Sequence, residues 1–148
     1  MPDTNDAFQR DKAKRNVLKL RALLQELPDF CFAFFRGIEP NTTLLTQIGY
    51  AYDLRIFFTF LIQELSDDFN LPTIRDIALK DLARIKPVHI EMYLEYLTYY
   101  LKDDDQPGTR SEYENHSPGK KRKLSALRSF FDYFYKKEKL PNNVIALI

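Results

Sequence analysis

The residues best suited to chemistry form a short basic segment near the C-terminal end of the chain. It opens with four cations in succession, Lys120, Lys121, Arg122 and Lys123. If the segment is helical, Lys121, Ser125 and Arg128 fall on one face. Lysine and arginine neutralise phosphates, and a serine hydroxyl can hydrogen-bond to them. The pattern is therefore typical of a surface that binds a phosphate backbone.

The charge distribution supports an anionic partner for this segment. The whole chain has a net charge of +1, but Pro118–Ile148 carries eight basic and two acidic residues, a net +6. Cations at the start of a helix oppose its dipole and repel one another, and an external anion would offset that cost. A solvated basic turn explains the same residues, and both interpretations stay open at this point.

Other signals for enzymatic or metal chemistry are weak. The two histidines, His89 and His116, form no zinc-binding pattern, and the four glycines form no phosphate-binding loop. The acidic run Asp103–Asp105 is best interpreted as solvated. Cys31 lies among phenylalanines, which favours a buried, unreactive thiol. We expect no metal and no cofactor.

Composition indicates a globular, intracellular protein. The chain has 148 residues, of which 45% are hydrophobic, enough for a packed core. Its first residues do not form a signal peptide, and no apolar run is long enough to span a membrane. The single cysteine excludes an internal disulfide. These features predict a cytoplasmic location.

Apolar residues with helical spacing predict an all-α fold with no sheet. Scarce glycine and few hairpin signals agree with this. The expected helices are Asp6–Leu27, Asp29–Ile38, Thr43–Leu65, Pro87–Leu101 and Pro118–Lys139, with shorter turns at Thr73–Ala78 and Asp81–Ile85. Lys102–Ser117 is polar, has no apolar period and predicts an exposed loop.

A second stripe on the expected helix Pro87–Leu101 is aromatic. It holds His89, Tyr93, Tyr96 and Tyr100. Tyrosine often packs its ring in a core and keeps its hydroxyl in water, so packing is the preferred interpretation. Contact with nucleic acid or a partner domain is the alternative.

From Thr42 onward the chain resembles the N-terminal core-binding domain, also called the SAM-like domain, of tyrosine recombinases and phage-type integrases. The resemblance rests on three blocks in order: Thr46–Leu61, with its tyrosine, aspartate–leucine and phenylalanines; Thr73–Ile77 followed by His89–Leu94; and Lys120–Phe134. The last block contains a leucine–serine–alanine–leucine–arginine run. Pro141-Asn142-Asn143 matches the place where the family passes to its catalytic domain.

The resemblance implies a small bundle of about four helices with an additional N-terminal helical segment. It implies three regions: an arm at 1–41, a DNA-binding domain at 42–141, and the start of a linker at 142–148. Phosphate contacts are expected from Lys120, Lys121, Arg122, Lys123, Ser125 and Arg128. Further contacts are expected from Thr43, Thr46 and Tyr50.

The implied function is to clamp duplex DNA for integration or recombination. The implied partners are double-stranded DNA, the catalytic domain of the same parent chain, and other recombinase protomers on DNA, with association with the nucleoid. The family's histidine is followed three places on by arginine, whereas His89 and His116 are followed by Met92 and Gly119. We therefore expect this chain to lack the catalytic residues and not to be an enzyme by itself.

Two other functions fit the same residues. A helical protein–protein module could use the basic helix to bind an acidic partner. A helix-turn-helix repressor fits less well, because that motif needs two helices joined by about three or four residues, and the joins here are longer.

Overall fold

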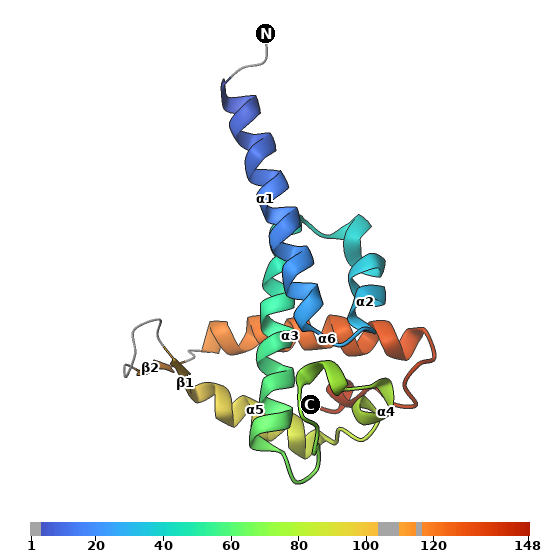
Figure 1. Cartoon of the computed structure of the whole chain (residues 1–148). Coiled ribbons are helices and arrows are strands. Elements are labelled where there is room, and N and C mark those ends of the chain that lie inside the picture. The colour runs from blue at the N-terminus through green and yellow to red at the C-terminus, as the bar shows by residue number, and fades with distance from the viewer. Residues whose placement is uncertain (1–3, 104–109, 115–116) are drawn as a thin grey trace. The chain divides into compact units, whose positions relative to one another are not determined.

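The computed structural model describes residues 4–103, 110–114 and 117–148 (Figure 1). Its contacts divide the chain into two compact units, Met1–Ala78 and Leu79–Ile148. Helices make up most of both units, which confirms the predicted all-α helical bundle. Within the described residues, no helix is both long and apolar enough to cross a membrane.

The first unit is built on three helices, α1 (Thr4–Glu26), α2 (Cys31–Ile38) and α3 (Leu44–Glu64). α1 and α3 run side by side in the same direction, and α2, which lies to one side of them, runs the opposite way (Figure 1). The 3-10 turns η1 (Glu39–Asn41) and η2 (Ile74–Asp76) complete the unit. The expected arm at 1–41 lies within this unit, because α1 packs along α3.

Leucines of α1 and phenylalanines of α2 and α3 form the core of the first unit. Leu27, Phe34, Phe57 and Phe58 are fully buried. Phe30 meets Phe58 edge to face, with ring centroids 6.2 Å apart. An ion pair between Arg55 and Glu26 links α3 to the end of α1. Aromatic packing of this size contributes much of a small core's stability.

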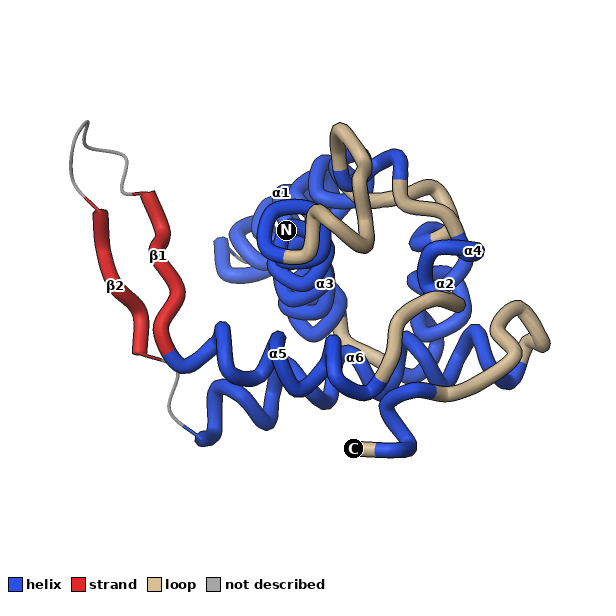
Figure 2. Tube along the Cα trace, turned by 90° about the horizontal axis from the view of Figure 1, so that it is seen from below, coloured by secondary structure: helices blue, strands red, loops and turns tan. Residues whose placement is uncertain are grey.

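The second unit consists of a short helix α4 (Leu79–Leu82), two longer helices, and the 3-10 turn η3 (Val144–Leu147). The longer helices, α5 (Pro87–Thr98) and α6 (Ser117–Lys136), lie side by side (Figure 2). Proline begins α5 and occupies the second position of α6, where a missing amide hydrogen costs nothing. η3 packs against α5 and α6, with Val144 and Ile145 buried.

The chain between α5 and α6 corrects two predictions. α5 ends at Thr98 rather than Leu101, and a hairpin follows it: β1 (Tyr99–Asp103) pairs antiparallel with β2 (Arg110–Glu114) (Figure 2). Tyr100 stands opposite Tyr113 in this register. The prediction of no sheet was therefore wrong for this segment. The rest of the predicted loop, 104–109 and 115–116, lies outside the described residues.

α6 ends in a tight turn with an unusual backbone. Glu138 has a φ of 59°, in the left-handed region that favours glycine. The Lys139 amide donates to the Phe134 carbonyl at 2.9 Å, and the Glu138 amide donates to that of Tyr135 at 3.0 Å. These bonds satisfy carbonyls at the end of the helix and turn the chain toward η3.

Candidate nucleic-acid interface

The N-terminal half of α6 holds the basic segment, and its side chains differ in exposure. Lys121, Arg122, Ser125 and Arg128 are exposed. Lys121, Ser125 and Arg128 follow each other at spacings of four and three, so they form one solvent-facing row. The predicted grouping of these three residues agrees with this exposure, and we call the row the cationic face of α6.

Lys123, one of the residues expected to contact phosphate, lies on the buried side of α6. Its side chain is only 6% exposed. Lys123, Leu127 and Phe130 follow each other at spacings of four and three, which puts the lysine on the buried side of the helix. Lysine can line such a face because its four-carbon stem is apolar. Lys123 is therefore separate from the exposed row, and its expected phosphate contact stays a prediction.

Lys120 has a structural contact within the second unit. Its ammonium donates a hydrogen bond to the hydroxyl of Thr98, the last residue of α5. The contact ties the start of α6 to the end of α5, on either side of the hairpin. An ammonium has three donors, so this bond leaves capacity for an anion.

The cationic face continues into a depression that sequence reasoning missed. A cavity of about 350 Å³ lies between α6 and η3, lined by Arg128, Ser129, Asp132, Asn143, Ile145 and Ala146. The Asn143 side-chain oxygen is buried and has no hydrogen-bond partner. Asp132 pairs with Lys136 at 2.8 Å and ends the cationic row. Asn143 could be found only after the fold had brought η3 beside α6.

Thr43, Thr46 and Tyr50 belong to the first unit, at the start of α3. The Thr43 hydroxyl caps α3 by accepting a hydrogen bond from the Thr46 amide, and it donates to the Thr46 hydroxyl at 2.9 Å. Thr46 is exposed. Tyr50 is half-buried and stacks on Phe34, with centroids 6.4 Å apart. Only Thr46 of the three combines full exposure with no capping role.

The aromatic stripe of α5 packs into the protein, which was the preferred interpretation of its sequence pattern. Tyr93 is fully buried and stacks on Tyr96, with centroids 6.4 Å apart. His89 is 6% exposed, and its Nδ1 accepts a hydrogen bond from the Lys86 amide at 2.9 Å. The side chain of Tyr100 lies outside the described residues.

The position of Cys31 in the core makes its thiol unreactive. Its side chain is fully buried, and this burial raises the pKa of the thiol far above its ordinary value. A thiolate is the reactive form, so burial suppresses nucleophilic chemistry. Across the described residues, no group of three or more histidine, cysteine or carboxylate side chains could hold a metal ion.

The fold and this surface define a helical protein with a cationic face suited to phosphate groups. The chain is similar to Tyrosine recombinase XerC of Caldanaerobacter subterraneus subsp. tengcongensis, with 32% identity over 127 residues. The match covers 84% of this chain and 32% of the relative, so the chain spans about a third of that protein's length. No family model matches the chain. No solved structure matches it.

This similarity confirms the resemblance to tyrosine recombinases that the sequence blocks predicted. It supports a tyrosine recombinase N-terminal region.

Proposed function

We infer that this chain is the DNA-binding module of a tyrosine-type site-specific recombinase or integrase, and that it clamps duplex DNA during recombination. The observation that carries the proposal is the exposed row of Lys121, Ser125 and Arg128 on α6, in a chain similar to a tyrosine recombinase. The residues that cut and rejoin DNA come, in this proposal, from a catalytic domain of the same parent chain.

The chemistry of the row suits a DNA backbone. The Lys121 ammonium is a point charge that neutralises one phosphate, whereas the planar guanidinium of Arg128 can donate two parallel hydrogen bonds to phosphate oxygens. The Ser125 hydroxyl lies between them on the same face and can donate one more. Contacts of this kind fix the position of the protein on the duplex and carry no sequence information.

The other residues expected at the interface contribute charge, direct contacts or structural support. Arg122, exposed beside the row, and Lys120 add positive charge near the start of α6. Thr46 and Tyr50 add contacts from the first unit, while Thr43 supports them as the cap of α3. The residue ranges 1–41, 42–141 and 142–148 stay as the proposed arm, DNA-binding domain and linker. The proposed partners are DNA and other recombinase protomers bound to it, which implies location at the nucleoid.

The proposal is tested by salt-dependent DNA binding of the whole chain. A fluorescently labelled duplex is titrated by anisotropy at several salt concentrations with the wild type and with K121A/R128A. Each lost phosphate contact lowers the slope of log K against log salt by about 0.9, so the double variant should weaken binding and flatten the slope by about 2. Ser125→Ala should weaken binding further without a comparable change in slope.

A matched control removes two other exposed charges, in K80A/K86A. This control should bind nearly as the wild type does, because those lysines lie off the cationic face. Equal binding and equal slopes for K121A/R128A and the wild type would contradict the proposed contact. No DNA binding by the wild type at low salt, with capture by an acidic protein surface instead, would favour the protein–protein alternative.

A further inference from the structure

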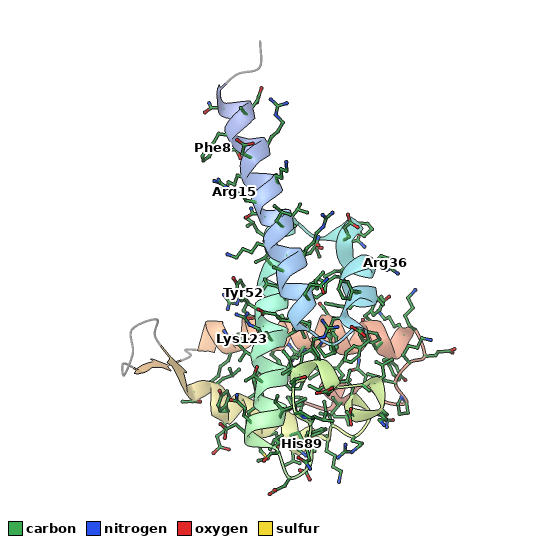
Figure 3. The ribbon with its side chains drawn as sticks, viewed as in Figure 1. Phe8, Arg15, Arg36, Tyr52, His89 and Lys123 are labelled. Carbon is green, nitrogen blue, oxygen red and sulfur yellow. The ribbon has the colours of Figure 1, made fainter. Side chains whose placement is uncertain are left out.

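The N-terminal half of α1 extends beyond the packed part of the first unit (Figure 1). Every residue from Asn5 to Arg15 is exposed, and Phe8 and Arg15 both project from this stretch (Figure 3). The leucines that bind α1 to its neighbours begin only at Leu20. About three turns of helix therefore contribute nothing to the core.

This stretch and the turns after it are strongly basic. Six cations lie between positions 10 and 21, with Asp11 as the one acidic residue: Arg10, Lys12, Lys14, Arg15, Lys19 and Arg21. Arg10 and Lys14 are four residues apart, as are Arg15 and Lys19, and like charges at this spacing destabilise a helix. Within the described part of the chain, Lys12, Lys14 and Arg15 have no ion-pair partner. The repulsion is thus left for an external anion to relieve.

The cations divide into two rows on opposite flanks of the helix. One row is Arg10, Lys14 and Arg21, and the other is Lys12, Arg15 and Lys19. At 3.6 residues per turn, the members of each row lie within about 60° of one another, and the two rows are about 150° apart. The buried leucines lie on a third side. The outward side between the rows carries Asp11 and the exposed Leu18, with small or uncharged residues beside them.

Two cationic flanks fit a ligand with two parallel lines of negative charge. The major groove of B-form DNA is about 12 Å wide and accepts an α-helix, with a phosphate strand along each edge. An acidic protein partner fits less well, because interface cores need several large apolar anchors, and Phe8 and Leu18 are the only exposed large apolar residues that the structure describes on α1.

We propose that the free half of α1 enters the major groove of B-form DNA, with each cationic flank neutralising the phosphates of one strand. This contact is separate from the cationic face of α6. The proposed α1 contact rests on the proposed function in one respect only, which is that duplex DNA is the partner in each. In this arrangement α1 is a second DNA-binding element, and its charge repulsion is relieved on binding.

The test removes one flank at a time. R10A/K14A and K12A/R15A are compared with the wild type and with K80A/K86A, using the same labelled duplex and salt series. Lys19 is left in place because its ammonium lies 5.5 Å from the Tyr52 ring centroid. Each flank variant should lower the salt slope by about 2, and the quadruple variant by about 4. Alanine is the best helix former, so circular dichroism should show helix content retained or raised.

The outcomes separate this inference from the proposed function. If both flank variants bind like K80A/K86A while K121A/R128A weakens binding, the inference fails and the proposed function stands. If the flank variants weaken binding and K121A/R128A does not, α1 binds DNA and the α6 contact fails. If only one flank responds, the helix does not lie in a groove, and the proposal is overturned.

A second duplex distinguishes groove entry from general attraction to polyanions. The major groove of A-form RNA is too deep and narrow to be entered in this way. The loss caused by the flank substitutions should therefore be much smaller on an RNA duplex of the same length. An equal loss on RNA and DNA would contradict major-groove binding.

Discussion

The Thr43 hydroxyl accepts a hydrogen bond from the backbone amide of Thr46 at 3.1 Å, and this bond caps α3, whose phenylalanines form much of the core of the first unit. The first amides of a helix have no partner inside the helix, so a side-chain acceptor at this position stabilises it. Thr43 was expected to contact DNA, and the structure adds a helix-capping role for its hydroxyl.

Thr43→Ala should therefore lower the free energy of unfolding by about 1 kcal/mol, measured by urea denaturation. Thr43→Ser and Thr43→Asp keep an acceptor and should restore most of the loss. Thr46→Ala is the matched control, because the amide of residue 46 is unchanged, and it should cost much less. If Thr43→Ala leaves stability intact but weakens DNA binding, the capping explanation is wrong.

The opposite orientations of Lys121 and Lys123 make a second prediction. Lys123→Ala removes a buried stem and should lower unfolding free energy by about 1–3 kcal/mol. Lys121→Ala removes an exposed side chain and should change stability by less than about 0.5 kcal/mol. In DNA titrations under conditions where both variants are folded, the salt slope should fall for Lys121→Ala only. A reversed pattern would place Lys123 on the outer surface.

Cys31 gives a third prediction, on reactivity. Because burial raises the pKa of its thiol, almost no thiolate is present in the folded protein at pH 8. A thiol reagent that absorbs on reaction should modify the native chain at least about 100-fold more slowly than the urea-unfolded chain. The unfolded thiol ionises above its ordinary pKa while the folded thiol does not, so this residue also lowers stability at alkaline pH. Fast modification of the native chain would show that the site opens readily.

Much of the fold could be predicted because the helices have strong local signals. Thr43 and Pro87 correctly indicated where α3 and α5 begin. The capping box of Thr73 and Asp76 accounts for the short turn predicted nearby. These features act within one or two turns, so periodicity and capping chemistry were sufficient.

The hairpin could not be predicted in the same way. Its strands follow α5 without a break, and the helical spacing of Leu94, Leu97 and Leu101 extends past the true end at Thr98. The pairing of Tyr99 with Glu114 joins residues far apart in sequence. Such pairing depends on how the strands meet, which local composition does not specify.

The sequence was enough to predict which residues make up the candidate site, but it predicted the directions of their side chains only in part. The run of four cations indicated the start of α6, and helical spacing put Lys121, Ser125 and Arg128 on one face, but Lys123 was not assigned to the buried side. Spacing from Lys123 to Leu127 and Phe130 already indicated the buried side. Lys120 and Thr98 are 22 residues apart, and their contact required the tertiary structure.

The exposure of α1 from Asn5 to Arg15 has a thermodynamic consequence. Tertiary packing normally provides most of a helix's stability, and stretches of about 12 residues are marginal without it. These turns should therefore exchange between helix and coil, and a ligand that binds only the helical form must also shift that equilibrium. Warming favours the coil, so the ligand's apparent affinity should fall more steeply with temperature than it would for binding to a preformed surface. The heat released when the helix forms should also appear in the binding enthalpy.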